Sequence, residues 1–281
     1  MGLRRWRGYD GVFAAFVVEF MRTHIFWALL ALLFAATSSW AVYVLFRPSY
    51  IYNRPAQPAF VMSFDDKYVG EWYAHRELFK KYSVRATFFI TMPHQLSPSE
   101  IEMLKQLAAD GHEIASHSYL HENSSKFIKR NGVPAYVAKE ITSAIKAMQA
   151  IGFTPSTFAY PYGARSITID RELNKYFHLL RGDSWKVAGK GIDELDRIFY
   201  KYDGNRLVHG LGVDANSGVT LQDLEIGFRR AAQNNEAILI YAHNILEQPS
   251  GYSISPQTLE SIFKLAQKHN LSSLTFRELI L

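Results

Sequence analysis

The sequence predicts an α/β protein built around a parallel sheet or barrel, with one transmembrane helix in front of it. Short apolar runs alternate with segments of helical periodicity throughout residues 59–281, which is typical of repeated strand–helix units. Polar side chains follow several of the apolar runs, as expected where parallel strands end at a ligand site. Residues 25–46 form a separate, uncharged stretch that is long enough to cross a bilayer.

Composition narrows the classes of function open to this chain of 281 residues. Hydrophobic residues make up 48% and charged residues 20%, a balance typical of folded proteins rather than disordered ones. The chain has no cysteine, which excludes disulfides, thiolate metal sites and a cysteine nucleophile. The basic residues behind the net charge of +5 are scattered, apart from a cluster at the N-terminus, so we expect no nucleic-acid partner.

The N-terminal segment predicts a membrane anchor at residues 25–46. Several arginines precede this apolar stretch, and their excess predicts a cytoplasmic N-terminus. Residues 1–24 are then a basic cytoplasmic segment, of which 11–20 either lies along the membrane surface or lengthens the helix. The alternative is a buried core helix, but a core helix this apolar on every face is unusual. We expect the rest of the chain on the periplasmic or cell-surface side.

Two regions follow the anchor. Residues 47–58 contain three prolines and read as a short, stiff linker. We expect residues 59–281 to form one folded domain, which the short linker would hold close to the membrane surface.

Local signals place the strands and helices of this domain. The best-marked helix begins with Ser97 as N-cap, Pro98 at the first helical position and Glu100 closing a capping box, and Gly111 ends it. Strands are expected at 59–64, 85–91, 112–116, near 157–161 and at 237–243, and helices at 69–82, 97–111, 134–151, 220–235 and 256–269.

Polar residues gather where the predicted strands end. Taken singly, each group has an ordinary explanation: paired aspartates are usually a solvated turn, a lone histidine is usually an interior residue, and a His-x-x-x-His spacing, which places two imidazoles on one helical face, arises often by chance. Their joint position at successive strand ends favours a site instead. The residues are Asp65 and Asp66, His117 and His121, Tyr160 to Gly163, and His243.

These residues also carry a resemblance to a known family. The motifs SFDD, HSYLH, YPYG and YAH, in this order and spacing, resemble those of the polysaccharide deacetylases of the NodB-homology type, carbohydrate esterase family 4. The resemblance covers residues 59–281. It implies a distorted, incomplete (β/α) barrel and metal-dependent hydrolysis of an N-acetyl group on a sugar.

The resemblance implies a role for each motif residue. One divalent ion is expected, with zinc as the default and nickel, cobalt or iron as alternatives for the same ligands. The roles are general base for Asp65, metal ligands for Asp66, His117 and His121, oxyanion donor for the main-chain N–H of Tyr162, and general acid for His243. Tyr160 and Pro161 of the same motif are expected to contact substrate.

Two positions depart from the family pattern. Ala159 stands where the family often has an arginine that steadies the base, and Arg85, Arg165 or Arg181 would have to supply that charge.

The family's usual Asp-Trp pair is interrupted by Ser184. We expect Asp183 to orient the catalytic histidine and Trp185 to line the substrate pocket, while an ordinary loop cap is an equal alternative for Asp183.

The expected function is therefore a metal-dependent N-deacetylase of an acetylated amino sugar. The substrate would be a membrane-proximal glycan or glycolipid, and membrane lipid and a glycan synthase or export complex are the expected partners. Two alternatives stay open. One is a deformylase or cyclic-amide hydrolase on the same fold, and the other is a non-catalytic glycan-binding or assembly subunit of a membrane complex.

Overall fold

A barrel of parallel strands forms the centre of the protein. The computed structural model describes residues 55–280, all of which belong to one compact unit. Seven strands follow one another in the order β1-β2-β3-β4-β5-β7-β8, and a pairing between β8 and β1 closes the ring. The β3–β4 junction is held by a single pair, Ser116 with Phe158, so the barrel is distorted there. This confirms the predicted incomplete (β/α) barrel.

The strands have these bounds: β1 Ala59–Asp66, β2 Ala86–Ile90, β3 Glu113–Ser116, β4 Thr157–Ala159, β5 Leu179–Ser184, β6 Phe199–Tyr200, β7 Leu207–Gly212, β8 Ala237–Ala242, β9 Asn244–Ile245, β10 Ser253–Ile254 and β11 Ser272–Leu274. Outside the ring, β11 continues the sheet beside β1, β6 pairs antiparallel with β8, and β9 and β10 form a small separate pair.

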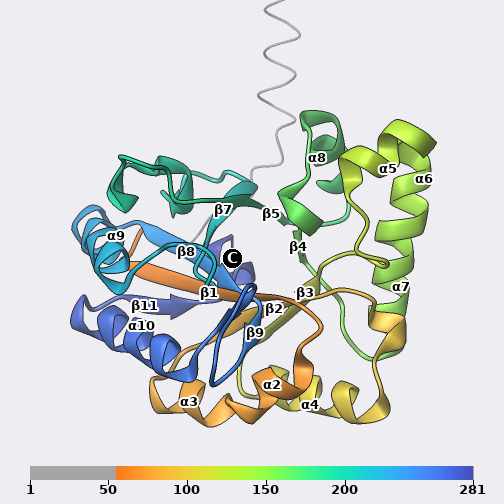
Figure 1. Ribbon diagram of the computed structural model, residues 1–281. Coiled ribbons are helices and arrows are strands. Elements are labelled where there is room, and N and C mark those ends of the chain that lie inside the picture. The colour runs from red at the N-terminus through yellow and green to blue at the C-terminus, as the bar shows by residue number, and fades with distance from the viewer. Residues whose placement is uncertain (1–54, 281) are drawn as a thin grey trace, which may run out of the picture. The chain divides into compact units, whose positions relative to one another are not determined.

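Helices surround the strands on the outside. Figure 1 shows α9 and α10 on one side of the barrel, α2 to α4 on a second side and α5 to α8 on a third. The α-helices are α2 Val69–Ala74, α3 Arg76–Lys81, α4 Pro98–Ala109, α5 Ser124–Asn131, α6 Val133–Tyr136, α7 Ser143–Ala150, α8 Ile167–Leu173, α9 Leu221–Asn234 and α10 Pro256–Lys268. A π-helical segment, η2 Val137–Thr142, joins α6 to α7, and short 3₁₀ turns are η1 Pro93–Gln95, η3 Pro161–Gly163, η4 Ile192–Glu194, η5 Asp196–Ile198 and η6 Arg277–Leu279.

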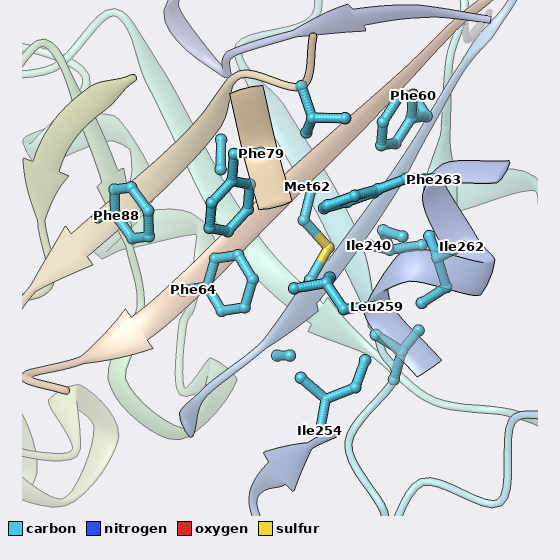
Figure 2. Packing of buried hydrophobic residues seen from close by; sticks show 14 of the residues in the cluster. Phe60, Met62, Phe64, Phe79, Phe88, Ile240, Ile254, Leu259, Ile262 and Phe263 are labelled. Atoms are coloured by element: carbon cyan, nitrogen blue, oxygen red, sulfur yellow. The ribbon is translucent and has the colours of Figure 1, made fainter. Parts of the chain in front are cut away.

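Strand β1 is buried on both faces because it lies between the barrel interior and the helices. Successive side chains of a strand point to opposite faces. Phe60, Met62 and Phe64 face outward and pack with α3 and α10, as Figure 2 shows. Ala59 and Val61 belong to a second cluster, which collects alternate residues of the other strands and therefore lies inside the barrel. Asp65 lies on the same inward face, near the C-terminal end of β1.

Most of the predicted elements are present, and the differences have local causes. The capping box of Ser97 and Glu100 begins α4 as expected. The predicted helix at 69–82 is two helices, because His75 leaves the helical conformation and its Nδ1 atom bonds to the carbonyl of Glu71 at 2.8 Å. The helix at 134–151 is continuous but contains the π-helical segment.

The far end of the barrel is closed by a buried carboxylate. Glu113 accepts hydrogen bonds from the hydroxyls of Thr87 and Thr157, at 3.0 and 2.6 Å, and from the backbone N–H of Arg277. Burial raises the pKa of Glu113 despite these donors. The neighbouring His112 accepts the backbone N–H of Ala86. Both residues thus bridge neighbouring elements at the start of β3.

The predicted membrane anchor at 25–46, the basic segment 1–24 and most of the linker lie outside the described residues. Among the helices of residues 55–280, none has the length and apolar character needed to cross a bilayer.

Candidate metal centre and active site

Asp65, Asp66, His117, His121 and His243 converge on one end of the barrel, as the strand pattern predicted. Asp65 and Asp66 end β1, His117 and His121 follow β3, and His243 follows β8. Parallel neighbours place these ends at the same rim.

Three of these residues form a compact cluster of metal-ligating atoms. The ligand atoms of Asp66, His117 and His121 all lie within 4.8 Å of one another. The Nε2 atoms of the two histidines are 3.2 Å apart, and Asp66 Oδ1 lies 3.3 Å from His121 Nε2 and 3.8 Å from His117 Nε2. Two nitrogens bound tetrahedrally to one zinc ion at about 2.0–2.1 Å would lie about 3.3 Å apart. The cluster therefore fits a tetrahedral divalent ion.

The two histidines lie on a loop that follows β3, so their spacing does not reflect a helical face. The loop connects β3 to α5 and reverses direction through Ser118 and His121, whose φ angles are +72° and +61°. Asp66 is also left-handed, with φ +83°. Non-glycine residues rarely adopt this conformation, and they gather at functional sites where the surroundings enforce it. Here the strained backbone turns both imidazoles toward Asp66.

Hydrogen bonds at the other ring nitrogen set the tautomer of each histidine. His117 Nδ1 lies 2.9 Å from the carbonyl oxygen of Ala159, which can only accept, so Nδ1 carries the proton and Nε2 offers its lone pair. His121 Nδ1 lies 3.2 Å from the hydroxyl of Tyr162, which allows the same tautomer. Burial lowers the pKa of His117 to about 4. Neutral imidazoles with free Nε2 atoms are the form that binds a metal.

Asp65 is buried beside the cluster and is paired with Arg181. The arginine lies on β5, and its Nη2 atom donates to Asp65 Oδ2 while Nη1 donates to Asp183 Oδ1 at 2.8 Å. Burial alone would raise the pKa of Asp65, but Arg181 outweighs it and holds the pKa below the ordinary value. Asp65 Oδ1 has no partner among the described residues. Asp65 is therefore an ionised carboxylate with one oxygen free to accept a proton.

Small residues make room for Arg181 inside the barrel. Its guanidinium lies 4.4 Å from the ring centre of Tyr241 and 5.4 Å from that of Phe89. A Cβ atom at Gly210 on β7 would meet Tyr241 at 3.0 Å and Arg181 at 3.3 Å. The arginine stacks on aromatic faces as its planar group favours. Of the three candidates for the charge missing at Ala159, Arg181 is the one that contacts Asp65.

His243 is held by a carboxylate that the sequence analysis did not identify. Its Nδ1 atom lies 2.7 Å from Asp214 Oδ2, and its backbone N–H donates to Asp214 Oδ1 at 3.0 Å. Trp72 of α2 donates to the carbonyl of His243 at 2.8 Å and anchors its backbone. Burial would lower the pKa of His243, but the bond to Asp214 and nearby carboxylates raise it above the ordinary value.

The expectations for Asp183, Tyr160 and Pro161 need correction. Asp183 orients Arg181, whereas Asp214 orients the histidine. Tyr160 is fully buried and donates its hydroxyl to Asp170, so its ring packs in the core and does not reach the rim. Pro161 is buried as well.

The remaining motif residues are exposed at the rim. Tyr162 is 62% exposed and adopts φ +59°, ψ +17°, and Trp185 is 63% exposed. Trp185 lines an open pocket of about 540 Å³ that begins at Asp183. The oxyanion role of the Tyr162 backbone and the substrate role of Trp185 stay predictions.

Sequence reasoning missed Asp214, which comes two residues after β7, a strand that it also missed. The rule that selected Asp65, a carboxylate at the end of a strand, would have selected Asp214 had β7 been recognised. Arg181, one of three candidates from the sequence, lies within β5, which was missed as well. Glycine and polar residues interrupt the apolar pattern of both strands and made them hard to recognise.

Comparison with known proteins agrees with this geometry. Residues 52–178 match the family model described as polysaccharide deacetylase. This match spans just under half of the chain and ends at the residue that precedes β5.

Solved structures share the fold at low sequence identity. A chitin deacetylase from Colletotrichum lindemuthianum superposes with a TM-score of 0.54 at 15% identity, covering 79% of this chain and 88% of that one. An acetyl xylan esterase of family 4 from Clostridium thermocellum, solved with a cobalt ion, gives 0.51 at 20% identity, covering 79% and 89%. A mutant of a family 4 pseudoenzyme with restored enzymatic activity gives 0.52 at 14% identity, covering 81% and 69%.

Two curated proteins match over shorter stretches. A gellan lyase from a Bacillus species is 29% identical over 125 residues, and the uncharacterized protein YlxY from Bacillus subtilis is 32% identical over 95 residues. The matched stretches cover 44% and 33% of this chain but only 5% and 28% of those proteins.

Proposed function

We propose that this protein is a metal-dependent deacetylase that removes the N-acetyl group from an amino sugar of a glycan. The fold and the family model support a carbohydrate deacetylase or esterase. The observation that carries the finer proposal is the placement of two charged pairs beside one metal-ligating cluster. Arg181 with Asp65 provides an ionised base, and Asp214 with His243 provides a protonated acid.

The metal cluster fits a divalent ion by its donor set and its spacing. Asp66, His117 and His121 would hold it, and when bound it would acidify a water molecule and polarise the acyl carbonyl. Two histidines and one carboxylate leave coordination positions open, which suits a catalytic rather than a structural ion.

Residues of the chain itself handle the protons. Asp65 accepts the proton of the attacking water at its unpartnered Oδ1, and Arg181 holds the carboxylate in place through Oδ2. An amine leaves poorly unless it is protonated. The bond to Asp214 and the nearby carboxylates raise the pKa of His243 despite its burial, which favours the protonated imidazole. Nε2 can deliver that proton while Nδ1 stays bonded to Asp214. The base thus accepts a proton and the acid delivers one, as the reaction requires.

Acetate release from N-acetylglucosamine oligomers by the full-length chain tests the proposal. We expect release that stops when the metal is removed with a chelator and returns when zinc or cobalt is added. Asp65→Asn and His243→Ala should each reduce acetate release by at least ~10²-fold, because each removes one proton-transfer group. His117→Ala should lose the metal itself, measured by elemental analysis.

Two results would contradict the proposal. If the wild-type protein holds no metal after zinc is added back and excess is washed away, the non-catalytic subunit becomes the better reading. Release of formate but not acetate from the same sugar would favour a deformylase.

We further propose that the substrate lies near a membrane, either as a lipid-linked saccharide or as a glycan leaving a synthase complex. The uncharged stretch 25–46 and the short linker after it support this placement on the extracytoplasmic side. Full-length protein in lipid vesicles should deacetylate a lipid-linked saccharide faster than the same saccharide in free solution. Equal rates would remove membrane proximity from the proposal.

A further inference from the structure

Glu140 is a carboxylate buried in the helical layer next to the metal-binding loop. Its side chain is fully buried, although it lies among apolar residues that include Tyr136 and Ile141. One oxygen, Oε2, accepts the backbone N–H of Leu120 at 2.9 Å. The other, Oε1, has no partner among the described residues. A buried carboxylate with only one bond is unfavourable for stability, so its presence calls for another explanation.

The bond from Glu140 reaches the residue that precedes a metal ligand. Leu120 is followed by His121, whose imidazole lies 3.3 Å from Asp66. The same loop carries Ser118 and His121 in the left-handed conformation, and the hydroxyl of Ser118 accepts the backbone N–H of His121 at 3.0 Å. Two side chains therefore hold two consecutive backbone N–H groups, and Glu140 is the one supplied from outside the loop.

The helix that carries Glu140 has an irregularity at that position. Residues Val137–Thr142 are π-helical, and the hydroxyl of Ser143 donates to the carbonyl of Ala138, five residues earlier, at 3.0 Å. A π-helical turn contains an extra residue, and such turns are frequently found at functional sites. Regular α-helix continues on both sides, in α6 and α7. The irregular turn is thus confined to the segment that contains Glu140.

We propose that Glu140 is a positioning residue for the metal ligand His121. Through the N–H of Leu120 it keeps the strained loop in the conformation that brings the imidazole of His121 beside Asp66. The proposal rests on the metal centre proposed above, and it assigns the buried charge and the π-helical turn to metal binding rather than to stability.

Metal affinity and thermal stability of the full-length protein separate this role from a structural one. The main variant is Glu140→Met, which fills a similar volume without the acceptor and without the buried charge. We expect the metal-free variant to unfold at the same or a higher temperature than metal-free wild type. We expect its zinc dissociation constant, measured by competition with a chromophoric chelator, to rise by about 10–100-fold, the usual effect of losing an outer-shell partner.

Two further variants complete the test. Glu140→Gln keeps an oxygen that can accept from Leu120, so it should bind zinc within about 3-fold of wild type, well inside the loss given for an outer-shell partner. Ile141→Val, at the neighbouring buried position, should lower the unfolding temperature without changing zinc affinity.

The outcomes are distinct. Wild-type zinc affinity in a folded Glu140→Met protein would overturn the proposal, as would a Glu140→Gln protein that loses as much affinity as Glu140→Met. A Glu140→Met protein that does not fold would assign Glu140 to folding and overturn the positioning role. No zinc binding by the wild type would overturn the proposed metal centre together with this inference.

Discussion

Arg181 forms a buried ion pair with Asp65 across the interior of the barrel, although the two residues are 116 positions apart in the chain. Strand alternation explains the encounter: Asp65 and Arg181 each occupy an inward-facing position of their strands, and Tyr241 provides the ring on which the guanidinium stacks. The second branch of the guanidinium bonds to Asp183. One buried arginine thus compensates two carboxylates.

Arg181→Met is expected to cost both stability and activity. The substitution leaves Asp65 buried without its cation, and breaking a buried pair in this way costs about 3–5 kcal/mol in free energy of unfolding. In the wild type the depressed pKa of Asp65 contributes stability above its ordinary value of 3.8, which is lost as pH falls through the lower folded pKa. In the variant, burial dominates and raises the pKa of Asp65.

The deficit in unfolding free energy should therefore be largest at neutral pH and shrink in acid, which denaturant titrations at several pH values can measure. The acid limb of kcat/KM should also move to higher pH. Arg165→Met is the matched control, because Arg165 pairs with Asp170 away from the metal cluster. It should lose stability without moving the acid limb. An unmoved limb in Arg181→Met would contradict the role of Arg181 at the base.

Asp214→Asn is expected to move the alkaline limb of the pH profile to lower pH. Burial lowers the pKa of His243, and Asp214 is the nearest group that opposes it. Because the folded pKa is raised, the protonated histidine and the stability it contributes are present at low pH and are lost as pH rises through that pKa. Without the Asp214 carboxylate, His243 loses its proton at a lower pH, so the protonated acid is present over a narrower pH range.

The measurement is the kcat/KM profile of Asp214→Asn and of the wild type, followed upward in pH from the ordinary histidine value of 6.5, because the pKa of His243 is raised above it. The asparagine amide would also face His243 Nδ1 with a donor and disturb the tautomer, so kcat should fall by ~10²–10⁴-fold. Asp223→Asn, at the cap of α9 on the surface, is the control and should leave the limb in place. If the profile of Asp214→Asn keeps the alkaline limb of the wild type, Asp214 does not raise the pKa of the proposed acid, His243.

Gly163→Ala tests whether the turn after β4 positions the charged pairs. Gly163 has φ +59°, and a Cβ atom there would lie 2.7 Å from Asp183 Oδ2, so the Asp183–Arg181 pair would have to shift. Gly152 also has positive φ, +96°, but a Cβ atom there meets nothing within 4 Å. Both variants should lose about 1–3 kcal/mol of unfolding free energy from the strained backbone. Only Gly163→Ala should also lower kcat, by up to ~10²-fold, since small displacements of a catalytic group have effects of that size.

Chemical denaturation and steady-state kinetics on the two glycine variants provide the comparison. Equal kcat values in Gly163→Ala and Gly152→Ala would show that the site tolerates movement of Asp183.

Sequence reasoning located the catalytic rim because its residues follow strands with strong apolar patterns. The strands that lead to Asp65 and His243 consist mostly of buried apolar residues, which makes them recognisable in the sequence. The strand before His117 is shorter and less apolar, because it contains Glu113 and Ser116 beside Ile114 and Ala115. Capping signals located the helices that begin after Ser97 and Ser255, because a side-chain cap depends only on residues close to it in the sequence.

The supporting residues could not be predicted in the same way because they depend on tertiary pairing. Asp214 follows β7, whose Gly210 and Gly212 leave space for Tyr241. Arg181 of β5 stacks on the same ring, and this arrangement exists only once the barrel closes. Glu140 carried a weaker signal: it is a charged residue at a position where the spacing of its helix places buried side chains. A carboxylate on an apolar helix face would have justified a search for its partner.

Tyr252→Ala is expected to weaken substrate binding without affecting stability. The ring of Tyr252 lies 5.1 Å from that of His243 and is 66% exposed, so it stands beside the proposed acid without being part of the core. Its backbone is fixed, because Tyr252 accepts a hydrogen bond from Asn244 and the following residue, Ser253, accepts one from Ala215. A fixed, exposed aromatic ring offers a face for a sugar ring at little entropic cost.

We expect KM for an oligosaccharide to rise by about 5–30-fold in Tyr252→Ala, corresponding to about 1–2 kcal/mol. Tyr252→Phe keeps the ring and should stay close to wild type. Tyr176→Ala removes another exposed tyrosine that precedes β5 at the opposite end of the barrel, and it should leave KM unchanged. If KM is unchanged in Tyr252→Ala while kcat falls, the ring acts on His243 rather than on the sugar, because a ring that bound only substrate would change KM first.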